Sequence, residues 1–222
     1  MQGVVTKMSK AVTKNMLCRV NTLLNIDESY KAPDRMMQLI SNSETAKELF
    51  FSFLREFDYD LSYEWFNDYF EDEHADRKKK KQDFTPTCIS KLMTEIFGQS
   101  NEGIICEPAA GTGSTIIQHW YKNVRSDYIW NYNPMNTLYF CYELSDKTIP
   151  FLLFNLMIRG INAVVIHGNT LTKKTKDVYH VFNEENNAMG FSSLKKVCRC
   201  KEVEKYFDVE FIDLKREGEI EK

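Results

Sequence analysis

The sequence predicts an α/β fold with a parallel sheet, preceded by a helical region. In the second half of the chain, short apolar runs rich in β-branched or aromatic residues alternate with longer segments, and the first three runs leave room for crossover helices. Between residues 32 and 70, apolar residues instead recur at helical spacing. A change from acidic to basic residues over 71–81 separates these patterns. We therefore expect a helical region at residues 1–76 and an α/β domain at residues 77–222.

Composition limits the classes of protein that this chain can represent. Its 222 residues are 43% hydrophobic, enough for one sizeable core, and the net charge of −3 excludes a uniformly basic coat for nucleic acid. The six cysteines are scattered, and Cys198 and Cys200 lack the further ligands that a zinc site requires. No stretch approaches the roughly 20 apolar residues of a membrane span. We expect a soluble, cytoplasmic protein with no metal site and no membrane contact.

The helical region is expected to consist of short packed helices. Asn42 or Ser43 can cap a helix over residues 44–57, since both side chains accept hydrogen bonds from the backbone N–H groups of a first turn. The basic run at residues 77–81 is typical of a solvated linker. Phosphate binding is the alternative interpretation, and the two are compatible if DNA orders the linker.

Four apolar runs are expected to form strands, at residues 103–106, 137–142, 163–166 and 178–182. After residue 187 the chain supplies one further helix, at 201–206, and one further strand, at 209–214. We therefore expect the sheet to be truncated or to be completed by another chain, and the edge at 209–214 would invite pairing with a partner.

Three of the strand ends carry features of nucleotide binding. The first run ends at Glu107, and a turn of small residues at 108–114 leads into a helix that begins near Thr115. Small residues let the backbone approach a ligand, and the helix start offers free N–H groups. The second run ends in Glu143, where nucleotide-binding folds place a carboxylate on the ribose, and the third is followed by Asn169, whose amide can bind an adenine edge.

Four motifs resemble, in sequence order, the S-adenosylmethionine-binding motifs of N6-adenine DNA methyltransferases. They are Asp83-Phe84-Thr85-Pro86, Glu107-Pro108-Ala109-Ala110-Gly111-Thr112-Gly113, Glu143-Leu144-Ser145-Asp146 and Gly168-Asn169-Thr170-Leu171. The likeness is strongest to the methylation subunits of type I restriction-modification systems and their short phage-borne relatives, and it covers about residues 83–183. It implies a Rossmann-like methyltransferase sheet at residues 77–222, which binds S-adenosylmethionine and is truncated.

The resemblance also implies a role for each motif. Phe84, Thr85 and Pro86 would close over the methionine end of the cofactor. The turn would pack against its amino-acid and sulfonium region, through Glu107, Pro108, Ala109, Gly111, Thr112 and Gly113. Glu143 would hold the ribose, Leu144 would pack on adenine, and Asn169, followed by Thr170 and Leu171, would face the adenine amino group. The family usually has Asp in place of Asn169. Asn keeps an acceptor oxygen but loses the charge, so we expect binding to survive in a weakened form.

The catalytic motif departs from the family pattern. Similar proteins have Asn or Asp, two prolines and an aromatic residue directly after the fourth strand, where they bind a flipped adenine. Here Asn183-Glu184-Glu185-Asn186 follows, so Asn183 is the candidate catalytic residue and the prolines and the ring are missing. Stacking on such a ring is worth about 1–3 kcal/mol per base. A second candidate, Asn133-Pro134-Met135-Asn136, precedes the second strand and is better interpreted as a turn.

Three functions stay open on this sequence. The first is a DNA adenine-N6 methyltransferase, active alone or with a partner. The second is a non-catalytic regulatory or decoy protein that binds a host methylation, restriction or defence complex. The third, a small-molecule methyltransferase, ranks last because nothing in the sequence indicates its acceptor. The expected partners are DNA and a protein, which would be a specificity subunit, a second copy or a host complex.

Overall fold

A computed structural model describes residues 16–75, 85, 87–96, 102–126 and 132–212. In the first part of the chain residues 16–24 are helical, and the next elements are η1 (Ser29–Lys31), α2 (Ala32–Ile40), α3 (Ser43–Glu56) and α4 (Phe66–Ala75). The predicted series of short helices is confirmed. Asn42 caps α3, since its side-chain oxygen accepts hydrogen bonds from the backbone N–H groups of Glu44 and Thr45.

The second part of the chain alternates helices and strands. Its elements are α5 (Thr87–Ile96), β1 (Gly103–Glu107), α6 (Ser114–Ser126), η2 (Pro134–Asn136), β2 (Thr137–Glu143), α7 (Ile149–Ile158), β3 (Ala163–Gly168), β4 (Lys174–Phe182), β5 (Ser193–Lys196), α8 (Lys201–Phe207) and β6 (Glu210–Phe211). The four predicted strands, the turn at 133–136 and the late helix are confirmed. Strand β5 was not predicted, and the expected strand at 209–214 is described only as the short β6.

The sheet is mixed, which corrects the expectation of a parallel sheet. Strands β1, β2 and β3 are parallel neighbours, whereas β4 runs antiparallel to β3. A parallel connection needs a dozen or more residues. Only residues 169–173 join β3 to β4, so the chain must turn back as a hairpin. Lys173 has a φ of 60° in this turn, and Gly168 leaves no room for a Cβ, which would lie 2.5 Å from the carbonyl oxygen of Lys174.

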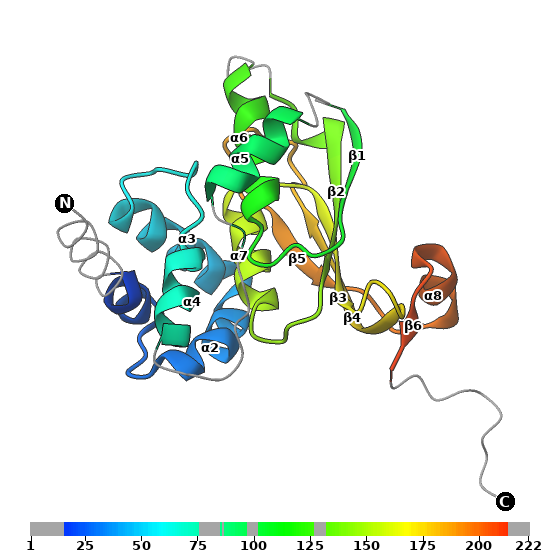
Figure 1. Cartoon of the computed structure of the whole chain (residues 1–222), viewed down its shortest axis with the longest axis horizontal. Coiled ribbons are helices and arrows are strands. Elements are labelled where there is room, and N and C mark those ends of the chain that lie inside the picture. Colours follow the sequence, from blue (N-terminus) through cyan, green and yellow to red (C-terminus); the bar gives the residue numbers. More distant parts are fainter. Residues whose placement is uncertain (1–15, 76–84, 86, 97–101, 127–131, 213–222) are drawn as a thin grey trace, which may run out of the picture.

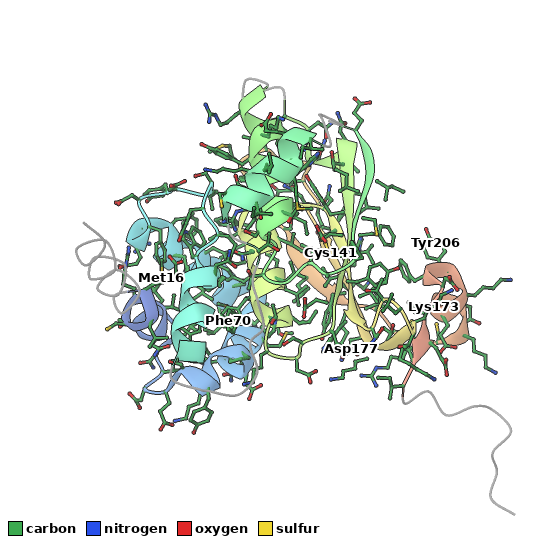
Figure 2. The ribbon with its side chains drawn as sticks, viewed as in Figure 1. Met16, Phe70, Cys141, Lys173, Asp177 and Tyr206 are labelled. Carbon is green, nitrogen blue, oxygen red and sulfur yellow. The ribbon has the colours of Figure 1, made fainter. Side chains whose placement is uncertain are left out.

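One hydrophobic core joins the helical region to the sheet. Helix α7 is buried along its whole length and lies between the sheet on one side and α2, α3 and α4 on the other (Figure 1). Phe154 of α7 contacts Phe50, Phe53 and Phe66, with ring centroids 4.5–5.6 Å apart. Met16 and Phe70 lie on this helical side of the sheet (Figure 2). Buried residues of the helical region and of the sheet thus belong to the same core.

The opposite face of the sheet carries a smaller apolar cluster and helix α8. Val164, Ile166 and Val178 from the sheet pack there with Val209 and Phe211. Figure 2 shows Tyr206 of α8 and Lys173 of the hairpin on this side of the sheet. Among the described strands, β1 is at one edge of the sheet, and its Ile104 is 71% exposed. The basic run at 77–81, Phe84 and Pro86 lie outside the described residues.

Candidate functional site

The glycine turn connects β1 to α6 at the carboxyl end of the parallel strands. Gly111 and Gly113 have φ angles of 56° and 97°, which L side chains rarely adopt. A Cβ on Gly113 would also lie 3.1 Å from the Cδ1 atom of Leu152. The N–H of Gly113 donates to the carbonyl of Ala110, and α6 then begins at Ser114. The turn therefore presents backbone atoms at the start of a helix, as the sequence predicted.

Glu143 at the end of β2 holds this turn in place. Its side chain is buried, and its Oε2 atom accepts the backbone N–H of Gly111 at 2.9 Å. Its Oε1 atom accepts the N–H of Ser145 at 2.7 Å. A carboxylate has about four acceptor positions, so two remain for other donors. Glu143 can thus fix the turn and still accept hydrogen bonds from ribose hydroxyls.

The end of β3 reaches the same turn through its hairpin. The Thr170 hydroxyl donates to the carbonyl of Pro108 at 2.7 Å, which ties the hairpin to the turn. The Oδ1 atom of Asn169 accepts the N–H groups of Leu171 and Thr172, at 2.9 and 3.0 Å. Asn169 is therefore a cap of its own hairpin, and its Nδ2 group is the part that can face a ligand.

Apolar side chains lie exposed around these polar groups. Leu144 is 59% exposed and Leu171 is 94% exposed, and Pro108 and Ala109 are exposed as well. Glu107 is partly buried, and burial raises the pKa of its carboxyl group. Exposed leucines beside a buried carboxylate and a glycine turn fit a ligand that has an apolar ring and a polar sugar.

A histidine lies beside Glu143 on the neighbouring strand. His167 pairs with Glu143 across β2 and β3, and its Nε2 atom is 3.0 Å from the Oδ1 atom of Asp146. Lys176 also contacts Asp146, at 2.5 Å. Burial lowers the pKa of His167, and Asp146 opposes this effect only in part. The neutral form of His167 is therefore favoured in the folded protein.

Asn183 does not join these residues, because β4 is antiparallel. Its backbone N–H donates to the side chain of Asn162, which precedes β3, so Asn183 lies at the amino-terminal edge of the parallel strands. The length of β3, roughly 17 Å, separates this edge from the glycine turn. The Asn183 side chain is buried and bonds to Gly160 and Asn187. Asn183 therefore lies apart from the glycine turn, and the structure does not bring the predicted catalytic residue together with the predicted cofactor site.

A buried polar network was not predicted and joins the helical region to the glycine turn. Glu64 is fully buried, and its carboxylate accepts the side-chain Nδ2 of Asn155 at 2.8 Å. The same Nδ2 group donates to the carbonyl of Thr112 at 2.8 Å. Arg159 donates to the carbonyls of Leu61 and Asn155, among others. Asn155 is the one polar side chain in α7, and such an isolated Asn indicates a buried partner.

Two cavities of the described structure lie away from the glycine turn. One of about 950 Å³ lies where Asn183 and Phe191 face the start of α3, and one of about 600 Å³ lies between α5 and α6. Within the described residues, no group of three or more His, Cys, Asp or Glu side chains is placed to hold a metal ion. No described helix has the length and apolar character that crossing a membrane demands.

The sheet, the glycine turn and the buried acid at the end of β2 define an α/β fold of the methyltransferase kind. Residues 58–191, more than half of the chain, match the family model described as N-6 DNA Methylase. The chain belongs to this family. It is also 31% identical over 113 residues to the type I restriction enzyme MjaVIII methylase subunit of Methanocaldococcus jannaschii. The aligned segment covers 50% of this chain and only 18% of that relative. No solved structure was found to match.

Proposed function

We propose that the chain binds S-adenosylmethionine at the carboxyl ends of β1, β2 and β3, as a DNA adenine-N6 methyltransferase-like protein. One observation carries the proposal: the buried carboxylate of Glu143 holds the glycine turn at Gly111 and keeps acceptor positions for a ribose. Family membership supports it, because the name of the family describes methylation of DNA. The cofactor would supply a methyl group on a sulfonium centre.

The residues of the proposed site divide by the part of the cofactor that they contact. Glu143 accepts the ribose hydroxyls, and Leu144 and Leu171 cover the adenine. The Nδ2 group of Asn169 lies toward the adenine edge, and Thr170 keeps the hairpin close to the turn. The methionine end lies against the turn and Thr85. Phe84 and Pro86, to which the resemblance assigns the same end of the cofactor, lie outside the described residues. The turn residues that complete the site are Glu107, Pro108, Ala109, Gly111, Thr112 and Gly113.

Methyl transfer to DNA would depend on a partner in this proposal. The loop after β4 lies at the wrong edge of the sheet to hold an adenine, and Glu184 and Glu185 follow Asn183 there. Among the described residues, no Asn-Pro-Pro-aromatic step follows a strand. A partner of the specificity-subunit type, a second copy or a host complex would then complete the target site. We place the protein in the cytoplasm, as a relative of phage-borne methyltransferases.

A second function is favoured by the same placement of Asn183. A regulatory or decoy protein needs the cofactor domain for its shape and does not need a catalytic loop. Such a protein would dock on a host methylation, restriction or defence complex and would transfer no methyl group. It differs from the first proposal in one measurable property, which is methyl transfer when the partner is present.

Calorimetric titration of S-adenosylmethionine into the purified protein tests the cofactor site. The parent protein should bind, and Glu143→Ala should lose most of the binding because it removes the ribose acceptor and releases the turn. Glu48→Ala is the matched control, since Glu48 is an exposed carboxylate on α3 of the helical region and belongs to none of the motifs. Absence of binding by the parent protein would refute the proposal. Transfer of a labelled methyl group to DNA, with and without a type I specificity subunit, then separates the methyltransferase from the decoy.

A further inference from the structure

Three segments of the candidate site meet at one buried side chain, Asn67 of α4. Its amide is 7% exposed. The Nδ2 atom donates to the carbonyl of Thr85 and to the hydroxyl of Ser114, both at 3.3 Å. The Oδ1 atom accepts the hydroxyl of Thr112 at 3.2 Å. Asn67 therefore links the helical region, the glycine turn and Thr85.

The orientation of this amide is fixed by its partners. A backbone carbonyl can only accept hydrogen bonds, so Nδ2 must face Thr85 and Oδ1 must face Thr112. The amide is planar and rigid, and its donors and acceptor diverge in one plane. If the turn moved relative to Thr85, at least one of these bonds would break. The amide thus sets the separation of the two segments.

The helix itself does not need the Asn67 side chain. Glu64 caps α4, because its carboxylate accepts the backbone N–H groups of Phe66 and Asn67 at 2.9 and 2.7 Å. The rings of Phe66 and Tyr69 anchor the helix in the core. Removal of the Asn67 amide should therefore leave α4 in place while it frees Thr85 and the turn.

We infer that Asn67 is a positioning residue of the S-adenosylmethionine site, which holds Thr85 at the glycine turn and so places the groups that contact the methionine end of the cofactor. The inference rests on the proposed function. It adds a residue from outside the four motifs, and it assigns to the helical region a direct part in cofactor affinity. The adenine and ribose contacts, at Leu144 and Glu143, do not involve Asn67.

The affinities for two ligands distinguish a positioning role of Asn67 from a general contribution to stability. S-adenosylmethionine carries the amino-acid end, whereas 5′-methylthioadenosine has the same adenosine and sulfur without it. Asn67→Ala should weaken binding of S-adenosylmethionine by about tenfold or more, because three hydrogen bonds are lost, two of them buried. Binding of 5′-methylthioadenosine should change by less than about twofold, because this ligand lacks the amino-acid end. A twofold change in affinity corresponds to under about 0.5 kcal/mol. Calorimetry measures both affinities on the same protein.

Two further variants make the test independent of folding. Asn67→Asp keeps the shape and the acceptor for Thr112 but loses the donors to Thr85 and Ser114, so it should show the same selective loss. Asn162→Ala is the matched control. It truncates another buried Asn that joins two segments, through Pro134 and Asn183, at the opposite edge of the sheet. It should bind both ligands like the parent protein.

The outcomes are distinct. If the parent protein binds neither ligand, the proposed function and the inference both fail. If the parent protein binds and both Asn67 variants bind S-adenosylmethionine equally well, the inference alone fails. It also fails if either Asn67 variant loses both ligands in the same proportion, since that pattern marks a structural residue. A selective loss for S-adenosylmethionine in both Asn67 variants, absent from Asn162→Ala, supports it.

Discussion

Substitution of Arg159 by Met should destabilise the protein more than any other single arginine change in its helical core. Arg159 follows α7, and its side chain is buried between the helical region and the sheet. It donates to the carbonyls of Leu61 and Tyr63 at 2.9 and 2.7 Å, and its guanidinium lies 4.9 Å from the ring centre of Trp65. Met retains the apolar stem and removes every donor.

The expected loss follows from these contacts. Each carbonyl that loses its donor in the interior costs about 1–3 kcal/mol. Loss of the ring contact adds about 1–2 kcal/mol, because the pair is desolvated. Relief of a buried charge offsets part of this cost, since burial lowers the pKa of Arg159 to about 9 and so disfavours its charged form. A net loss of about 3–5 kcal/mol is typical when one member of a buried charged group is removed.

Urea unfolding followed by circular dichroism and by tryptophan fluorescence measures this loss. A fall of about 3–5 kcal/mol corresponds to a melting temperature lower by about 6–20 °C for a chain of this size. Arg19→Met is the matched control, because Arg19 also lies over a ring, that of Phe57 at 4.3 Å, but is partly exposed. It should cost about 1 kcal/mol or less. If Arg159→Met costs no more than Arg19→Met, the apolar core alone holds the helical region and the reasoning is wrong.

Three further predictions concern other parts of the fold. Gly160→Ala should lower the free energy of unfolding by about 2–5 kcal/mol, because Gly160 has a φ of 64° and a Cβ there would lie 2.4 Å from the carbonyl oxygen of Gly190. Gly103→Ala is the comparison: its φ is 110° but the space around it is open, so a thermal melt should show a smaller loss. Burial lowers the pKa of His167 below its unfolded value, so its neutral form is favoured on folding and stability should fall as the pH drops through about 6.5. His167→Asn should remove this part of the pH dependence, and identical pH profiles for parent and variant would contradict the assignment. Asp177 accepts hydrogen bonds from Lys196 and Arg199, and although burial raises its pKa, these bonds outweigh burial and lower it. Asp177→Asn should therefore cost about 1 kcal/mol at neutral pH, and the difference from the parent should vanish as the pH falls below the carboxyl range.

Local patterns allowed much of the fold to be predicted. The helical spacing of Phe50 and Phe53 predicts α3 because a helix buries one stripe of its surface. The strands β1, β2 and β3 follow from short β-branched or aromatic runs. The glycine turn and Glu143 come together because the carboxyl ends of parallel strands share one edge of the sheet, which the spacing of the motifs already implied.

The direction of β4 was accessible to sequence reasoning but was misjudged. The segment between β3 and β4 is too short for a crossover helix, and this length alone predicts a hairpin. With β4 taken as parallel, Asn183 is expected at the carboxyl edge of the parallel strands, whereas the structure has it at their amino-terminal edge. Motif order along a chain does not fix the position of a residue in space, because the reversal of one strand exchanges the two edges of the sheet.

The sequence by itself determined the class of fold, the position of the glycine turn and the acidic residue that holds it, because these depend on periodicity and on short-range turn chemistry. Only the tertiary structure decided that Asn67, Glu64 and Asn155 join the helical region to that turn. Their contacts span more than forty residues of chain, and no local pattern specifies which distant polar groups will be buried together. The physical reason is that a buried polar group requires a partner but can find it anywhere along the chain, so its identity is fixed only when the elements pack.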